Sequence, residues 1–156
     1  QALRLGLGLY GLWPSSQTRD DARARGIHLR PALVWKTIIA QIKTVPKGTP
    51  VGYGLTERVK RPSRIAVLPI GYWDGYDRGL SSRGEVLVHG KHCRILGRIC
   101  MNMCMVDVTD VPAARVEDEV VVLGGEITAE ELAEKTETVN YEVVTRINPL
   151  IPRIVV

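Results

Sequence analysis

The stretch GEVLVHGKHCRILGRI, residues 84–99, decides the fold class, because it has the pattern of a β-hairpin. Two short runs rich in Val, Ile and Leu stand on either side of a bend at Gly90–Lys91. Such runs, separated by a tight turn that contains glycine, are typical of paired antiparallel strands. We therefore predict two strands that pair across this bend.

Similar runs lie on both sides of the hairpin. WKTIIAQIKTV (residues 35–45) alternates in part and ends at a Pro/Gly turn, and RIAVLPIGYWDGY (residues 64–76) has the pattern of a buried strand that runs into a Gly/Asp turn. Residues 103–111 and 118–125 are interpreted as two more strands. Short strands at this spacing predict a compact, mainly β domain of barrel or sandwich type.

One segment has a clear helical pattern. In TAEELAEKTE (residues 128–137), Thr128 is suited to cap the first turn, and Glu131 follows three residues later, which makes a capping box. We therefore predict one short helix within the β domain.

The beginning of the chain differs from the rest. RLGLGLYGLWPS (residues 4–15) predicts a glycine-rich strand, because leucines alternate with glycines, and the polar residues that follow predict a loop. We expect residues 1–31 to be the tail of a separate unit and residues 32–156 to form the β domain. The chain begins with Gln1 rather than Met, and residues 3–13 already have the pattern of buried structure, so we expect that it was cut from a longer protein.

The composition is that of a globular protein, with 45% apolar and 24% charged residues and a net charge of +4. The longest basic run, ERVKRPSR (residues 57–64), has no interleaved aromatic residues, which favours a solvated loop or an interface over nucleic-acid binding. No apolar run is long enough to span a bilayer. Three cysteines without regular spacing indicate a reducing cytoplasm rather than a disulfide scaffold.

Gly6, Gly8 and Gly11 match the dinucleotide fingerprint G-x-G-x-x-G. That fingerprint needs a helix directly after its glycines and an acidic residue about 20 positions further on. The residues after Gly11 are Leu-Trp-Pro-Ser-Ser, and no acidic residue lies at that distance, so we reject a nucleotide site. Glycines inside a strand indicate tight packing or a phosphate bound by backbone N–H groups, and the motif alone does not separate these alternatives.

The sequence gives weaker signals for a metal site and for a serine-hydrolase site. His89, His92 and Cys93 could supply metal ligands, but a hydrogen-bonded hairpin histidine and a buried cysteine are the simpler interpretation, so we predict no metal. Every serine that could serve as a nucleophile lies in a polar loop outside any G-x-S-x-G motif, which argues against a serine hydrolase.

Longer motifs carry a family resemblance. With RLGLGLYGLWPS, the motifs VGYGLT (51–56), GYWDGY (71–76), GRICMNM (97–103) and TVNYEV (138–143) follow one another in an order that strongly resembles the alanine racemases. These are fold-type III, pyridoxal-phosphate-dependent amino-acid racemases. The resemblance implies the last βα segment of a (β/α)₈ barrel, followed by a C-terminal β domain that is barrel-like.

The resemblance also implies a cofactor site for pyridoxal 5'-phosphate. Arg4 matches the arginine that hydrogen-bonds the pyridine nitrogen, and a guanidinium donates there without readily giving up its proton. Gly6 and Leu7 match the positions whose backbone N–H groups hold the cofactor phosphate, and Tyr141 matches a tyrosine whose hydroxyl reaches that phosphate.

Further residues match the catalytic and substrate positions of the family. Racemisation needs groups on both faces of the α-carbon, and the family uses the Schiff-base lysine and a tyrosine that matches Tyr53. Met101 matches the residue whose backbone N–H receives the substrate carboxylate, and Tyr72 and Arg98 match residues at the entrance. The resemblance implies a head-to-tail homodimer in which Tyr53 and Met101 act across the interface, which gives two composite sites. The implied reaction interconverts L-alanine and D-alanine in the bacterial cytoplasm, and D-alanine feeds cell-wall peptidoglycan.

The chain departs from the family pattern in ways that leave alternatives open. It has no lysine before Lys36, so the Schiff-base lysine is absent and we expect this chain alone to be incomplete and inactive. Asn102 stands where the family usually has Asp, which is either silent or changes the substrate, to serine for example. The sequence IPRI near the end lacks the aromatic residue that often follows. The alternatives are a serine racemase of the same family and a non-catalytic β module for dimerisation.

Overall fold

The computed structural model describes Ala2 and residues 5–156, and Arg4 lies outside the described residues. The chain divides into two compact units, Gln1–Val34 and Trp35–Val156.

The glycine-rich segment in the first unit is a 3₁₀ helix, Gly6–Tyr10, so the prediction of a strand there was wrong. A strand would place Leu5, Leu7 and Leu9 on one face. Only Leu7 is buried, at 9% exposure, whereas Leu5 and Leu9 are 66% and 69% exposed. Gly6 has a φ of +56°, which interrupts extended backbone at the point where the strand would begin.

The polar residues that follow also form a helix rather than the predicted loop. Helix α1 spans Ser16–Ala24, and the Ser15 hydroxyl caps it by accepting the Thr18 N–H at 3.1 Å. Ala22 is the one buried residue of this helix, so there was no apolar periodicity for the sequence to display. Ser15 is a helix start signal of the N-cap type, and the prediction of a loop did not use it.

The second unit is mainly β, as predicted, and its strands pair antiparallel. One sheet has the order β1-β9-β6-β7, a second β2-β5-β8, and β3 pairs with β4. The strand bounds are β1 Trp35–Ile38, β2 Gln41–Val45, β3 Pro50–Val51, β4 Glu57–Arg58, β5 Ser63–Leu68, β6 Glu85–Val88, β7 Lys91–Arg94, β8 Cys104–Asp107 and β9 Glu119–Leu123.

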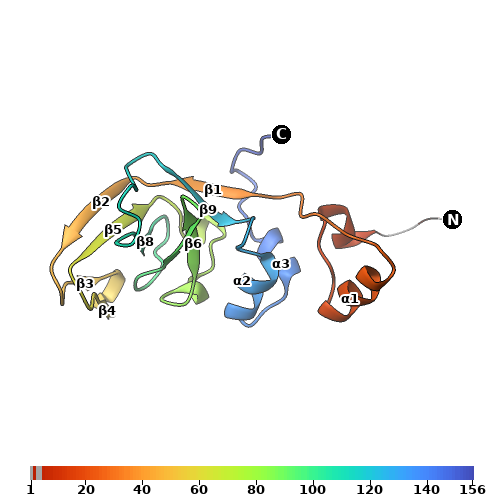
Figure 1. The fold of residues 1–156 in the computed structure, drawn as a ribbon, viewed down its shortest axis with the longest axis horizontal. Helices are drawn as coiled ribbons and strands as arrows, with labels where there is room; N and C mark the ends of the chain where they lie inside the picture. Colours follow the sequence, from red (N-terminus) through yellow and green to blue (C-terminus); the bar gives the residue numbers. More distant parts are fainter. Residues whose placement is uncertain (1, 3–4) are drawn as a thin grey trace. The chain divides into compact units, whose positions relative to one another are not determined.

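The two larger sheets are joined along the chain. Strands β1 and β2 follow each other almost directly but belong to different sheets (Figure 1). A bridge between Ile95 and Val106 links the end of β7 to β8. The side chains that face inward are mostly Val, Ile and Leu, with Ile39, Val86, Ile95, Val106 and Val120 fully buried. These joints give the barrel-like core that positions the loops described below.

The bend of the predicted hairpin lies at His89–Gly90, one residue earlier than expected. Val88 pairs with Lys91 across it, and His89 and Gly90 have φ values of +50° and +72°. Two positive φ values in a two-residue loop match the right-handed twist of the flanking strands, and glycine is favoured at the second position.

Two helices belong to this unit. Helix α2, Ala129–Lys135, confirms the predicted helix, and the Thr128 hydroxyl accepts the Glu131 N–H at 3.1 Å. The Glu131 carboxylate accepts a hydrogen bond from Lys135 at 2.6 Å. Helix α3, Asn140–Thr145, was not predicted, because it is six residues long and rich in β-branched side chains. It packs beside α2, as Figure 1 shows.

Short 3₁₀ turns complete the unit at Tyr53–Leu55, Tyr72–Asp74 and Arg78–Leu80. Within the part of the chain that the structure describes, no helix is both long enough and apolar enough to cross a membrane.

Candidate functional site

Tyr53 stands on the turn that joins β3 to β4. Gly52 and Gly54 on either side of it have φ values of +81° and +76°, a backbone region that glycine occupies without strain. The turn is closed by a hydrogen bond of 3.1 Å from the Leu55 N–H to the Gly52 carbonyl. It leaves the Tyr53 side chain 70% exposed. The tyrosine is thus presented to solvent on a hydrogen-bonded turn.

This turn packs against the loop that carries Arg98. A Cβ atom at Gly52 would lie 2.9 Å from the Arg98 amide nitrogen, and one at Gly54 would lie 3.1 Å from the Arg98 guanidinium. The guanidinium therefore covers Gly54, next to Tyr53 in the chain. The structure brings together Tyr53 and Arg98, which are 45 positions apart in the sequence.

A half-buried carboxylate lies behind this contact. Glu57, on β4, accepts hydrogen bonds from the Ser82 hydroxyl at 2.6 Å, from the Gly97 N–H at 2.7 Å and from the Arg94 guanidinium. Burial alone raises the pKa of Glu57, but the hydrogen bonds from Ser82, Arg94 and Gly97 outweigh it, so that the pKa lies below its usual value. Glu57 is therefore ionised at neutral pH.

Tyr72 and Met101 are held together by backbone hydrogen bonds. The Tyr72 N–H donates to the Cys100 carbonyl at 3.1 Å, and the Trp73 N–H donates to the Met101 carbonyl at 2.9 Å. A Cβ atom at Gly71 would collide with both of these carbonyl groups. The Met101 N–H makes no hydrogen bond to another described residue, so it can donate to an acceptor from outside.

A cleft of about 420 Å³ opens beside Tyr72, lined by Gly75, Asp77, Arg78 and Arg146. Arg146 forms ion pairs with Asp77 and with Glu142, which fixes its guanidinium at the wall. Sequence reasoning missed Arg78 and Asp77 as lining residues. The sequence signal for this turn was Asp77, a residue suited to cap the 3₁₀ turn Arg78–Leu80. Its carboxylate accepts a hydrogen bond from the Gly79 N–H at 2.7 Å.

Tyr141 lies on α3 and its side chain is exposed. The end of α3 packs against the loop that follows Tyr72, because a Cβ atom at Gly75 would collide with the Arg146 carbonyl. Tyr141 is therefore on the helix that borders the cleft.

The expected cofactor residues near the start of the chain lie in the other unit. No atom of the described residues lies within 4 Å of a Cβ position at Gly6, and Leu7 is buried. Arg4 is outside the described residues. The structure thus brings together Tyr53, Tyr72, Arg98 and Met101 from three loops of the β domain, and it describes Gly6 and Leu7 separately.

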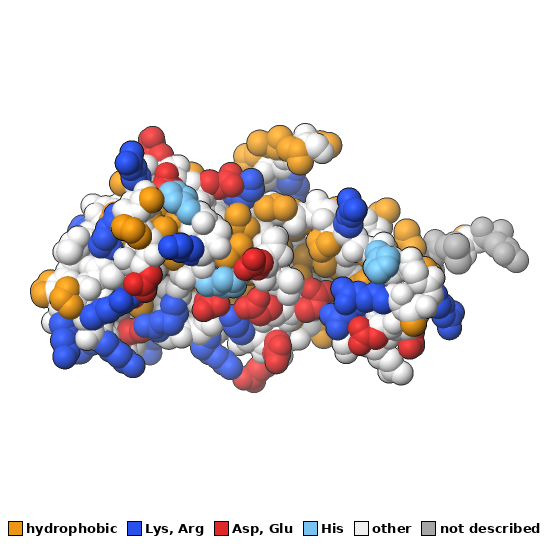
Figure 2. Space-filling model, viewed as in Figure 1, with side chains coloured by type: hydrophobic (Ala, Val, Ile, Leu, Met, Phe, Trp, Pro, Cys, Tyr) orange, Lys and Arg blue, Asp and Glu red, His pale blue; other side chains and the backbone are white. Residues whose placement is uncertain are grey.

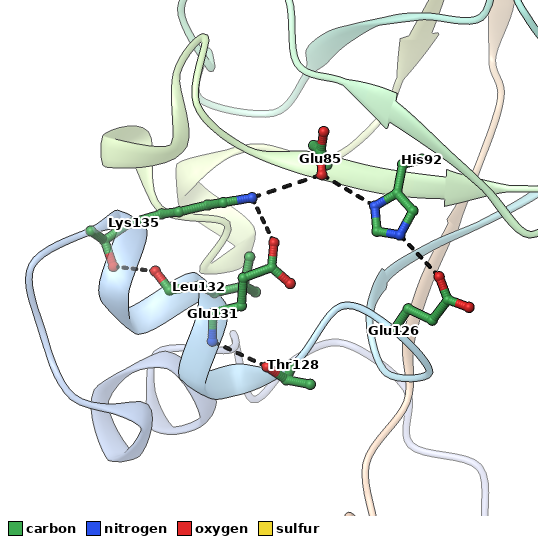
Figure 3. Close-up of polar contacts among 8 residues, drawn as sticks. Glu85, His92, Glu126, Thr128, Glu131, Leu132 and Lys135 are labelled. Carbon is green, nitrogen blue, oxygen red and sulfur yellow. Dashed lines mark hydrogen bonds and ion pairs between the residues drawn. The ribbon is translucent and has the colours of Figure 1, made fainter. Parts of the chain in front are cut away.

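Of the three residues considered as metal ligands, the two histidines have separate partners and the cysteine is buried. His89 pairs with Asp118 at 2.8 Å. His92 lies between Glu85 and Glu126, at 3.1 and 3.0 Å, as Figure 3 shows. Cys93 is buried, which raises the pKa of its thiol to about 11. Among the described residues, no group of three or more His, Cys, Asp or Glu side chains could hold a metal ion.

The basic run at residues 57–64 contributes to a surface rich in Lys and Arg around β3 and β4 (Figure 2). Much of this charge is used within the domain. Arg58 donates to the Gly48 carbonyl at 2.9 Å, Arg61 pairs with Asp110, and Arg64 donates to three carbonyl groups of residues 111–114. These contacts favour a structural role for the basic run within the domain over nucleic-acid binding.

Comparison with known proteins identifies the family. The family described as "Alanine racemase, C-terminal domain" matches residues 32–155. The alanine racemase of Leptospira interrogans is 50% identical over 99% of this chain, and that of Methylacidiphilum infernorum is 46% identical over 97%. The chain spans about two fifths of the length of these relatives, 41% and 38%.

Solved structures indicate the same family. The alanine racemase of Streptomyces lavendulae superimposes with a TM-score of 0.86 at 41% identity, covering 96% of this chain and 39% of that one. The alanine racemase of Bacillus anthracis with bound L-Ala-P superimposes with a TM-score of 0.83 at 38% identity, covering 92% and 36%. A mainly β domain of this fold is thus shared with these enzymes. The chain belongs to the alanine racemase family, in which it corresponds to the C-terminal domain.

Proposed function

We propose that this chain is the C-terminal part of a pyridoxal-phosphate-dependent alanine racemase, which interconverts L-alanine and D-alanine and supplies D-alanine for peptidoglycan. The observation that carries the proposal is that the loop with Arg98 and Met101 packs against the Tyr53 turn at Arg98 and is hydrogen-bonded to the loop of Tyr72 at Met101. Each of these residues stands in a motif that resembles the family, and three loops distant in sequence present them together.

The residues present fit a cofactor that carries a phosphate. Gly6 has a positive φ and nothing within 4 Å of a side-chain position, so a phosphate oxygen can approach its backbone. The resemblance assigns Tyr141 a hydrogen bond to the cofactor phosphate, and its side chain is exposed. When bound, pyridoxal phosphate acts as an electron sink that makes the α-proton of the amino acid removable. Arg4 would donate a hydrogen bond to its pyridine nitrogen.

The β domain contributes proton transfer and substrate orientation. Tyr53, as the phenolate left when a neighbouring base has taken its hydroxyl proton, would take the α-proton from L-alanine on one face. In the reverse direction its hydroxyl would return a proton to that face. The Met101 N–H would donate a hydrogen bond to the substrate carboxylate, and Tyr72 and Arg98 would line the entrance to the active site. As the family resemblance implies, Tyr53 and Met101 would serve the cofactor of a partner subunit in a head-to-tail homodimer. The enzyme would work in the cytoplasm, where D-alanine is needed for cell-wall precursors.

The catalytic lysine would come from a barrel segment that this chain does not contain. Lys36, the first lysine of the chain, is paired with Glu119 at 2.9 Å across β1 and β9. We therefore expect the purified chain, given pyridoxal phosphate and L-alanine, to produce no D-alanine in a D-amino-acid oxidase assay. Robust turnover by the chain alone would overturn the assignment of the second base to a missing lysine.

A chimera tests the function itself. The chain would replace the corresponding part of the Leptospira interrogans relative, which supplies the barrel. We expect this chimera to racemise L-alanine and to prefer it to L-serine. A folded, dimeric chimera that binds cofactor but turns over neither amino acid would contradict the proposal and favour the non-catalytic module. A preference for serine would identify the alternative racemase.

A further inference from the structure

Glu57 occupies an unusual position for a carboxylate in a basic run. Its side chain is 15% exposed, and its partners come from two segments of the chain, one at Ser82 and one at residues 94–97. The Ser82 hydroxyl, the Arg94 guanidinium and the Gly97 N–H all donate to it. Because every partner is a donor, only an ionised carboxylate satisfies all of them together.

The same residue is connected to the Tyr53 turn through the backbone. Glu57 is paired with Val51 across β3 and β4, so the two residues form the base of the turn that carries Tyr53. On the other side of its carboxylate, Gly97 packs against Gly52, with the Gly97 Cα 3.1 Å from a Cβ position there. Glu57 thus contacts both segments whose junction presents Tyr53 and Arg98.

The loop held by Glu57 has a second attachment through the same serine. The Ser82 N–H donates to the Gly97 carbonyl at 3.1 Å while the Ser82 hydroxyl donates to Glu57. Gly97 is therefore bonded at both its N–H and its carbonyl. The Arg94 guanidinium adds a positive charge beside the carboxylate.

We propose that Glu57 is a positioning residue for racemisation: its carboxylate holds the Gly97–Arg98 loop against the Tyr53 turn and so fixes where Tyr53 and Arg98 stand. This inference rests on the proposed function of Tyr53 as the base that takes the α-proton of L-alanine. A displacement of about 1 Å in such a group can lower turnover by about 10²-fold. Glu57 acts through Tyr53 and does not itself touch the substrate.

The first test is Glu57→Gln in the active chimera. Glutamine keeps the shape but turns an NH₂ donor toward one of three donors, so at least one hydrogen bond is lost. We expect kcat to fall about 10- to 100-fold with a smaller change in KM. The primary isotope effect with L-[2-²H]alanine should rise and that with D-[2-²H]alanine should fall, because the step assigned to Tyr53 becomes slower than the step assigned to lysine.

Asp110→Asn is the matched control, because Asp110 also pairs with an arginine, Arg61, but in an exposed position away from the Tyr53 turn. We expect its kinetics to match those of the parent chimera. Ser82→Ala is a milder second variant, which removes one donor to Glu57 and should change kcat and the isotope effects in the same directions to a smaller extent. It keeps the proposal testable if Glu57→Gln does not fold.

Hydrogen exchange gives a readout that needs no activity. In this chain, Glu57→Gln should speed amide exchange at residues 97–98 and at 52–55, while exchange in α2 stays unchanged. Unchanged exchange at 52–55, or unchanged kcat and isotope effects in a folded Glu57→Gln chimera, would overturn the positioning role. If the parent chimera itself is inactive, the proposed function fails, and faster exchange at 52–55 would still support the structural link between Glu57 and the turn.

Discussion

Gly52 and Gly97 lie backbone against backbone, and neither position has room for a side chain. A Cβ atom at Gly97 would lie 2.8 Å from the Val51 carbonyl oxygen, and one at Gly52 would lie 2.9 Å from the Arg98 amide nitrogen. The two loops that carry Tyr53 and Arg98 therefore meet at a contact that only glycine permits.

Gly97→Ala should separate these two loops. Gly90→Ala is its matched control, because Gly90 and Gly97 have similar φ values, +72° and +68°, but a Cβ at Gly90 meets nothing within 4 Å. Both variants carry the cost of left-handed backbone, and Gly97→Ala adds a clash that should lower the free energy of unfolding by about 1–3 kcal/mol more. Urea unfolding of the chain, followed by tryptophan fluorescence, measures both. Equal losses would show that the contact is looser than described.

Tyr53→Phe should lower kcat of the chimera by about 10²- to 10⁴-fold, because it removes the group proposed to transfer a proton. The fold should be unaffected, since the Tyr53 side chain is exposed and its hydroxyl makes no hydrogen bond to another described residue. Steady-state kinetics with L-alanine, together with the melting temperature, provide the measurement. Turnover at the parent rate would remove Tyr53 from the mechanism.

Tyr76→Phe should leave the domain as stable as before, or stabilise it by up to about 1 kcal/mol. The Tyr76 side chain is buried against Trp35, with ring centroids 6.1 Å apart, and its hydroxyl has no hydrogen-bond partner among the described residues. Removing a buried, unsatisfied hydroxyl relieves its desolvation cost. Urea unfolding checks the sign, and a loss above about 1 kcal/mol would reveal a hydrogen bond to that hydroxyl.

His92 should make stability depend on pH. Its pKa is raised above the usual value, first by the hydrogen bond to Glu126 and then by Glu85, which also faces Lys135 (Figure 3). Because the folded pKa exceeds the unfolded one, the stabilisation is complete below about pH 6.5 and is lost as pH rises through the folded pKa. NMR titration of the imidazole should therefore give a pKa above about 6.5.

Glu126→Gln should lower this pKa, and His92→Gln should remove the corresponding part of the pH dependence of the melting temperature. The effect is small because the pair is solvent-exposed. An imidazole pKa at or below its usual value would contradict the described pairing.

Strands that display apolar periodicity could be predicted from sequence. β1, β2, β6, β7, β8 and β9 lie within the predicted segments, and β5 begins one residue before its segment. The failures have a common physical origin. The 3₁₀ helix at Gly6–Tyr10, α1 and α3 bury few side chains or contain β-branched residues, so capping and tertiary contacts rather than periodicity determine them.

The residues of the candidate site also differ in how far the sequence predicts them. Tyr53, Tyr72, Arg98 and Met101 stand in local motifs and could be named from the sequence. Glu57 could not, because its partners are 25 to 40 positions away and it opens a run of basic residues that has the composition of a surface loop. Only the folded chain brings those three donors to one carboxylate.

The pairing of β1 with β9 also sets the order in which this domain can be completed during synthesis. Strand β1 lies at the edge of its sheet with β9 as its neighbour, and Trp35 pairs with Leu123. The sheet β2-β5-β8 needs the chain only as far as Asp107, so the loops around Tyr53 can be assembled while later residues are still inside the ribosome. Strand β1, the first of the domain, can pair only after β9, the last strand, has been synthesised. We therefore expect the pairing of β1 with β9 to be the slow, non-local step of folding.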